Sequence, residues 1–199
     1  VPLWLAVRGG LVVIPAATAP LLWHQHEMLF GFAAAAATGF ILTAIPNWTG
    51  RLPVSGWRLG ILAFLWLLGR VAMMSSTLIG SVVGPIAGPM VTAAIDLSFL
   101  TLMAFTIARE LIGGGNWRNL PVLALFVLFA LGNWLFHLQQ IGLAETAAMG
   151  IRLAIFVLTV LITLVGGRII PSFTRNWLKK KGAAALPAVL DGLDKSALA

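Results

Sequence analysis

Long runs without a charged residue constrain the fold of this chain more than any other feature. The clearest run extends from Met28 to Pro46 and is rich in alanine. A helix needs about 20 apolar residues to cross a bilayer, and only helices and closed barrels satisfy their own backbone in lipid. The runs are too continuous for barrel strands, which alternate apolar and polar residues. With 60% hydrophobic residues and a mean hydropathy of +0.99, the chain is predicted to be an all-α, polytopic transmembrane helical bundle.

Five full spans and a truncated first helix are predicted. Residues 1–23 are read as the tail of that first helix followed by a loop, because glycines and prolines interrupt them. A signal peptide is the alternative, but no basic segment precedes the apolar stretch. Residues 1–178 are predicted to form the transmembrane domain, and 179–199 a basic, then alanine- and leucine-rich cytoplasmic tail or linker. The predicted spans are about 28–46, 58–77, 87–108, 120–138 and 147–167.

Lysine and arginine in the short loops predict the orientation, because cytoplasmic loops carry an excess of them. The loop after the first full span contains Arg51 and Arg58, the loop after the third contains Arg109 and Arg118, and the tail begins with Arg168. The loops between them contain no lysine or arginine. The net charge of +7 is therefore explained by orientation in a membrane, and it needs no nucleic-acid partner.

The three histidines of the chain are predicted to lie at the outer, periplasmic face. His24 and His26 begin the first full span, and His137 ends the fourth. Neutral imidazole is the commonest protein ligand of metal and haem centres. On an ideal helix His24 and His26 point about 200° apart, so at most one of them is expected to pair with His137. The alternative is that all three are solvated interfacial side chains.

Polar neighbours support a site at this face. Glu27 and Met28 follow the first two histidines, and Met28 is a further candidate metal ligand. Asn133, His137 and Gln140 are spaced i, i+4 and i+7, so they form one polar stripe on an apolar helix. This stripe is expected to face the interior of the bundle.

Three charges fall within the spans, each in the predicted outer half of the membrane. A charge at a helix centre costs about 2.5 to 3.5 kcal/mol on insertion scales, so Arg70, Asp96 and Arg152 are expected to avoid the lipid. An ion pair between Asp96 and an arginine is one interpretation. The other is functional: Arg70 or Arg152 binds haem propionates, or Asp96 handles protons.

A strip of small residues lies just below the first two histidines. Gly31, Ala35 and Gly39 recur at four-residue spacing on the first full span. Such a strip is typical of close helix packing, which is the favoured interpretation. The alternative is that it leaves room for the edge of a porphyrin.

The absence of cysteine limits the cofactor chemistry. It excludes iron–sulfur ligation, thiolate haem, a cysteine-based copper site and covalent haem attachment. Any haem must therefore be a non-covalent haem b. No nucleotide-binding motif or HExxH zinc motif occurs either.

Two blocks of sequence resemble the NnrS family. The first runs from Trp23 through His24, His26 and Glu27 to the segment PNWTG that ends at Gly50, and the second is residues 166–177. The resemblance implies a bacterial inner-membrane protein that binds haem and copper and takes part in the nitric oxide response. Family members are about twice as long, so this chain would be a first half lacking its start. The prolines of both blocks are expected to end helices.

Three functions remain open. The leading hypothesis is a haem-binding and possibly copper-binding protein that protects cells from nitric oxide; whether it is an enzyme is left undecided. His137 with one of His24 and His26 is the preferred haem pair, which leaves the other histidine for copper or a hydrogen bond. The alternatives are half of a transporter or channel with a buried arginine and aspartate pathway, and a quinol-linked b-type cytochrome. The oligomeric state is undecided.

Overall fold

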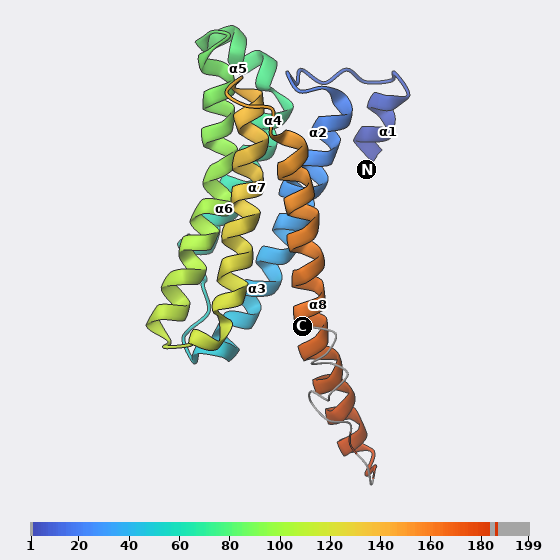
Figure 1. Cartoon of the computed structure of the whole chain (residues 1–199), viewed down its shortest axis with the longest axis vertical. Coiled ribbons are helices and arrows are strands. Elements are labelled where there is room, and N and C mark those ends of the chain that lie inside the picture. The colour runs from blue at the N-terminus through green and yellow to red at the C-terminus, as the bar shows by residue number, and fades with distance from the viewer. Residues whose placement is uncertain (1, 184–185, 187–199) are drawn as a thin grey trace. The chain divides into compact units, whose positions relative to one another are not determined.

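The computed structural model describes residues 2–183 and 186, and this part of the chain is helical without strands (Figure 1). Five helical stretches are long and apolar enough to cross a membrane, so the chain is a multi-pass membrane protein. The elements are α1 (Pro2–Arg8), α2 (Pro20–His26), the π-helix η1 (Glu27–Ala33), α3 (Ala34–Thr49), α4 (Trp57–Met74), α5 (Ser76–Val83), α6 (Ala87–Gly113), the short 3₁₀-helix η2 (Trp117–Asn119), α7 (Leu120–Gln140) and α8 (Ala147–Lys180).

The first full span starts earlier than the hydropathy predicted. It is a composite of α2, η1 and α3 that begins at Pro20, where proline is favoured because the first helical N–H needs no partner. His24 and His26 therefore lie inside a helix and not at its start. The prolines of the two motif blocks do not end helices either, because α3 continues through Pro46 and α8 through Pro171.

The second predicted span is broken near its outer end. Helix α4 stops before Ser75, and a separate helix, α5, follows. The loop between α1 and α2 is attached to this break, because Ser76 Oγ accepts a hydrogen bond from the Ala17 N–H at 2.8 Å and the Pro15 carbonyl accepts one from Thr77 at 2.9 Å. The loop and α5 thus close the same end of the bundle, seen at the top of Figure 1.

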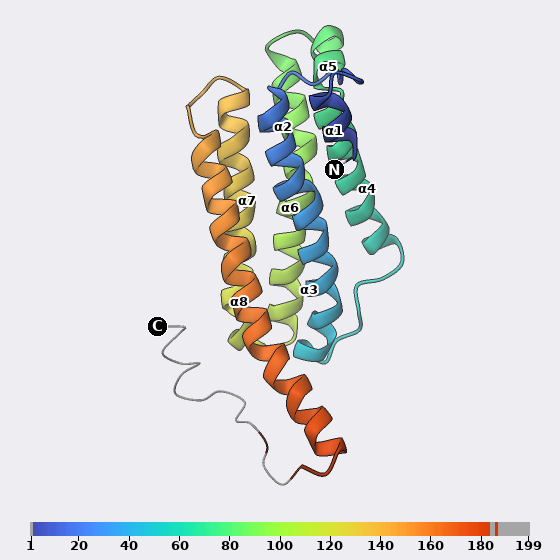
Figure 2. The ribbon, with the colours of Figure 1, turned by 90° about the vertical axis from the view of Figure 1, so that its right-hand side faces the viewer.

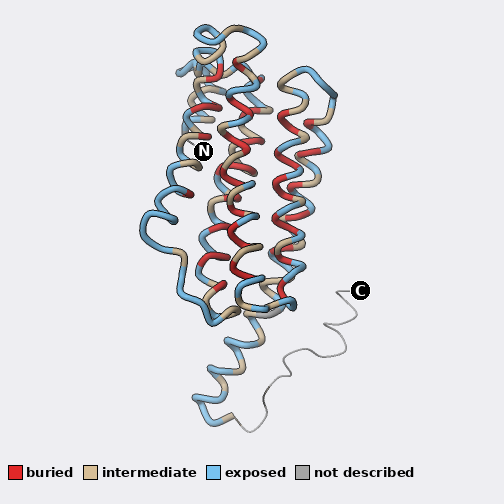
Figure 3. Tube along the Cα trace, turned by 90° about the vertical axis from the view of Figure 1, so that its left-hand side faces the viewer, coloured by how far each residue is buried: buried red, intermediate tan, exposed pale blue. Residues whose placement is uncertain are grey.

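The chain divides into two compact units, Val1–Val157 and Leu158–Ala199. In the first unit α6 is the central helix, with α3, α4, α5 and α7 packed around it (Figure 2). Its buried residues follow one another along most of its length, and Figure 3 shows buried positions concentrated on the facing sides of these helices. Because α6 is covered on several sides, its buried polar side chains, such as Asp96 and Glu110, lie away from lipid.

The two basic loops meet at the other end of the first unit. The Asn116 side chain, just after α6, donates a hydrogen bond to the Trp48 carbonyl near the end of α3. This agrees with the predicted placement of Arg51 and Arg118 on one side of the membrane. Most of the predicted tail, residues 184–185 and 187–199, lies outside the described residues, whereas Lys179 and Lys180 belong to α8.

Candidate metal centre

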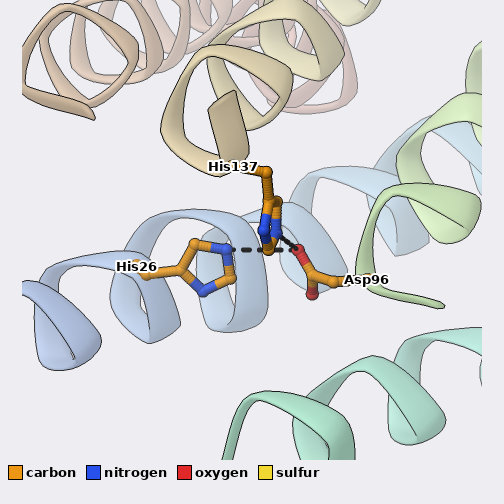
Figure 4. Close-up of side chains that lie close together, drawn as sticks. All are labelled: His26, Asp96 and His137. Atoms are coloured by element: carbon orange, nitrogen blue, oxygen red, sulfur yellow. Dashed lines mark hydrogen bonds and ion pairs between the residues drawn. The ribbon is translucent and has the colours of Figure 1, made fainter. Parts of the chain in front are cut away.

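Three helices bring one potential metal ligand each to a single buried point (Figure 4). His26 is the last residue of α2, Asp96 lies in the N-terminal half of α6, and His137 is in the last turn of α7. One ligand atom of each residue lies within 4.8 Å of the others, and all three side chains are at most 2% exposed. We call these three residues the His–Asp cluster.

The carboxylate of Asp96 is the hub of the His–Asp cluster. Its Oδ2 atom lies 3.1 Å from His26 Nε2 and 2.9 Å from His137 Nε2. The same oxygen accepts a hydrogen bond of 2.8 Å from the Asn133 amide, whose Oδ1 in turn lies 3.0 Å from His26 Nε2. The His26 N–H is therefore shared between two acceptors, and the amide of Asn133 is oriented by both neighbours.

A buried ion-pair network balances the charge of the Asp96 carboxylate. Arg70 donates through Nη2 to Asp96 Oδ1 and through Nη1 to Glu27 Oε1, the latter at 2.7 Å. Glu27 Oε1 also lies 3.3 Å from His26 Nδ1. The predicted pairing of Asp96 with an arginine is confirmed, and the arginine is Arg70. Two acidic groups and one guanidinium thus surround the imidazole of His26.

Glycines make room for this network. A side chain at Gly31 would meet Arg70 Nη1 at 2.7 Å, and one at Gly69 would meet Asp96 Oδ1 at 3.0 Å. Gly39, the last member of the small-residue strip, has open space around it. The strip is therefore not a uniform packing face, because Gly31 accommodates the arginine and Gly39 contacts no other helix.

One ring nitrogen of the cluster has no hydrogen-bond partner among the described residues. The imidazole of His137 uses Nε2 toward Asp96, while its Nδ1 is buried without a hydrogen bond. Phe136 packs beside both rings, and Phe30 covers His26. An N–H at Nε2 leaves the lone pair of His137 at Nδ1, so a buried nitrogen lone pair is present in an apolar wall.

His24 lies on a different face, as the angular argument predicted. Its ring stacks on Trp4 of α1, with centroids 4.4 Å apart and planes 2° from parallel. His24 and Met28 both line a groove of about 610 Å³ between α1, α2, η1 and α4. We call it the outer groove; its walls are Leu3, Trp4, Trp23, His24, Glu27, Met28, Phe32, Leu67, Arg70, Val71 and Met74.

The remaining predicted site residues lie elsewhere. Gln140 accepts a hydrogen bond of 3.1 Å from Thr18 and so fastens α7 to the loop before α2. Arg152 is exposed and does not join Arg70 and Asp96. Two residues that the sequence analysis missed, Trp4 and Trp23, line the outer groove. Both are tryptophans near the predicted membrane surface, where such residues are common, so residue type alone did not distinguish them.

The geometry can be compared with known proteins. No curated protein and no solved structure matches the chain. The family model described as NnrS protein, in contrast, matches residues 1–199. This match covers the His–Asp cluster, the outer groove and both of the sequence blocks that suggested the resemblance. The chain therefore belongs to the NnrS family.

Proposed function

We propose that this chain is the metal- and haem-binding part of a bacterial inner-membrane protein that acts in the nitric oxide response. The observation that supports it most directly is the convergence of His26, Asp96 and His137 at one buried point. Buried ionisable groups inside a membrane domain are costly and usually functional. Family membership suggests the nitric oxide response, and the ligand chemistry suggests the metal.

The His–Asp cluster suits one small ion such as copper. An ion with bonds of about 2.0 to 2.1 Å holds adjacent ligand atoms roughly 3 Å apart. The hydrogen-bonded separations of 3.1 Å and 2.9 Å from Asp96 Oδ2 to the two imidazoles are close to this spacing, and an ion bound through both Nε2 atoms would replace their hydrogens. Two imidazoles and a carboxylate suit copper, iron or zinc, and the family resemblance favours copper. Asn133 and Arg70 would then keep the carboxylate oriented.

A haem does not fit between His26 and His137. Their ring centroids are only 5.5 Å apart and their planes are nearly perpendicular. Asp96 Oδ2 lies against both Nε2 atoms, so the carboxylate occupies the position that a porphyrin would need. The cluster thus brings together two histidines that the sequence analysis considered as a haem pair, but its geometry favours an ion over a haem held by both.

The outer groove offers a better place for haem. Its walls are mostly apolar, and His24 supplies an imidazole that the stacked ring of Trp4 holds in orientation. Among the described residues, two buried donors of the wall, Trp23 Nε1 and Arg70 Nε, have no hydrogen-bond partner, and they suit acceptors such as propionate oxygens. A haem held by His24 would supply an iron that can bind a diatomic molecule such as nitric oxide.

Two substitutions separate the two sites. In the purified full-length protein, His137→Ala should reduce bound copper to background, because it removes an imidazole ligand, while the Soret band of haem stays. His24→Ala should do the reverse. Metal content is measured by inductively coupled plasma mass spectrometry, and haem by the visible spectrum. Loss of both signals in both variants would contradict the assignment of two separate sites.

Nitric oxide provides the functional readout. Adding it to the reduced protein should shift the Soret band, and the shift should be absent in His24→Ala. A colourless protein from haem-replete cells would exclude haem at the outer groove. The transporter hypothesis has no support among the described residues, since Arg152 lies apart from Arg70 and Asp96.

A further inference from the structure

A second polar cluster lies at the opposite end of the bundle, far along the helices from the His–Asp cluster. Glu110, near the end of α6, is buried, with only 4% of its side chain exposed. Arg51, in the loop after α3, donates through Nε to Glu110 Oε2 at 2.7 Å, and Arg109 donates to Oε1. Both arginine side chains remain about 40% exposed. One buried carboxylate thus holds two arginines at the surface.

These arginines line a groove that carries excess positive charge. The groove has a volume of about 650 Å³ and includes a third arginine, Arg58, whose guanidinium lies 5.5 Å from the centre of the Trp57 ring. Three arginines face one glutamate, so the net charge of the lining is about +2. Each guanidinium has five N–H donors, and Glu110 occupies only part of this capacity. The groove therefore suits an anion with several oxygen acceptors.

An apolar crevice continues from this groove into the span region. It is a space of about 140 Å³ between α4 and α6, and it shares Trp57, Arg58 and Arg109 with the groove. Its deeper walls include Ile61 and Phe105, which are exposed on spanning helices. A charged recess joined to an apolar crevice on membrane helices matches a molecule with an anionic head and a hydrocarbon chain.

We infer that Arg51, Arg58 and Arg109 bind the phosphodiester headgroup of an anionic phospholipid, and that the first part of one acyl chain enters the crevice between α4 and α6. Charge complementarity selects the headgroup, because a net positive recess disfavours zwitterionic lipids relative to anionic ones. The basic loops place this site at the predicted cytoplasmic surface, where Trp57 is typical of the headgroup region. Glu110 has a positioning role, since it fixes two of the arginines without contacting the lipid.

The test uses the purified full-length protein in non-ionic detergent, with bound lipid counted by native mass spectrometry. Phosphatidylglycerol should be retained and phosphatidylcholine should not. Arg58→Gln is the preferred variant, because it removes a headgroup contact and leaves the Glu110 ion pairs intact. It should weaken phosphatidylglycerol binding about fivefold, the effect expected of one arginine near a membrane surface. Ile61→Trp should also weaken binding by filling the crevice.

Matched controls keep the result interpretable. Arg118→Gln removes an exposed arginine at the same end of the bundle but outside the groove, so it should leave binding unchanged. Equal loss in Arg118→Gln and Arg58→Gln would overturn the proposal, since it would indicate a diffuse basic surface. Retention of phosphatidylcholine equal to that of phosphatidylglycerol would overturn it too. Competition by millimolar inorganic phosphate, with no effect of Ile61→Trp, would indicate a soluble phosphate ligand in place of the lipid.

Discussion

At the residue scale, Asp96 determines how the outer half of the bundle is held together. Its two oxygens contact Arg70 on α4, His26 on α2, and Asn133 and His137 on α7, so Asp96 joins α6 to three other helices. A carboxylate in this position needs all its partners, because an unpaired buried charge is costly and each remaining partner would also lose its acceptor.

Asp96→Asn should destabilise the protein strongly. The substitution removes the charge of the buried ion pair with Arg70 and leaves Glu27 as the remaining acidic partner of that guanidinium among the described residues. Breaking a buried pair in this way costs about 3 to 5 kcal/mol. The midpoint of unfolding, followed by circular dichroism in detergent, should fall by many degrees. Ser98→Ala, which removes only a hydrogen bond to the Ile95 carbonyl on the same helix, should leave the midpoint nearly unchanged. Equal midpoints for the two variants would show that Asp96 is not the hub.

At the element scale, the π-helix η1 follows directly after the two histidines of the first span. Composition predicted the span because apolar length is enough to identify it. It could not predict η1, since the wider turn depends on contacts such as the Trp66 N–H donated to the Gly31 carbonyl at 3.0 Å. The angular offset of His24 from His26 was predictable because it follows from helix geometry. The sequence left open which of His24 and His26 lies next to His137, because packing between α2, α6 and α7 decides it.

Two glycine substitutions on this span should have opposite effects. Gly31→Leu should displace Arg70, because even a Cβ atom there would lie 2.7 Å from Nη1. It should lower the unfolding midpoint and reduce copper retention. The added methyl group of Gly39→Ala meets open space. The higher helix propensity of alanine should therefore raise the free energy of unfolding by up to about 1 kcal/mol and the midpoint slightly. A similar fall in the unfolding midpoint for both variants would instead support the interpretation of the small-residue strip as a continuous packing face.

At the scale of the whole molecule, the two polar clusters lie in opposite halves of the spanning helices. The His–Asp cluster is close to the end that contains α5, and the arginine groove is close to the loops that follow α3 and α6. The distribution of lysine and arginine among the loops predicted this separation, because such a prediction needs only the number of helices and the composition of the loops. It did not predict Glu110, since the count of lysine and arginine ignores a carboxylate at a helix end. The exposed position of Arg152 was also not predictable, because burial depends on which helices pack against α8.

The orientation in the membrane is the last prediction. A reporter fused after Gly142, in the loop between α7 and α8, should be periplasmic, because that loop lacks lysine and arginine. A fusion after Gly115, in the loop between α6 and η2, should be cytoplasmic, since Arg109 and Arg118 flank it. Alkaline phosphatase is active only outside the cytoplasm and green fluorescent protein mainly inside it, so paired fusions at both sites give complementary signals. A cytoplasmic signal at Gly142 would place the His–Asp cluster on the inner side. The groove lined by Arg51, Arg58 and Arg109 would then lie in the outer leaflet, whereas the lipid proposal assigns it to the cytoplasmic leaflet.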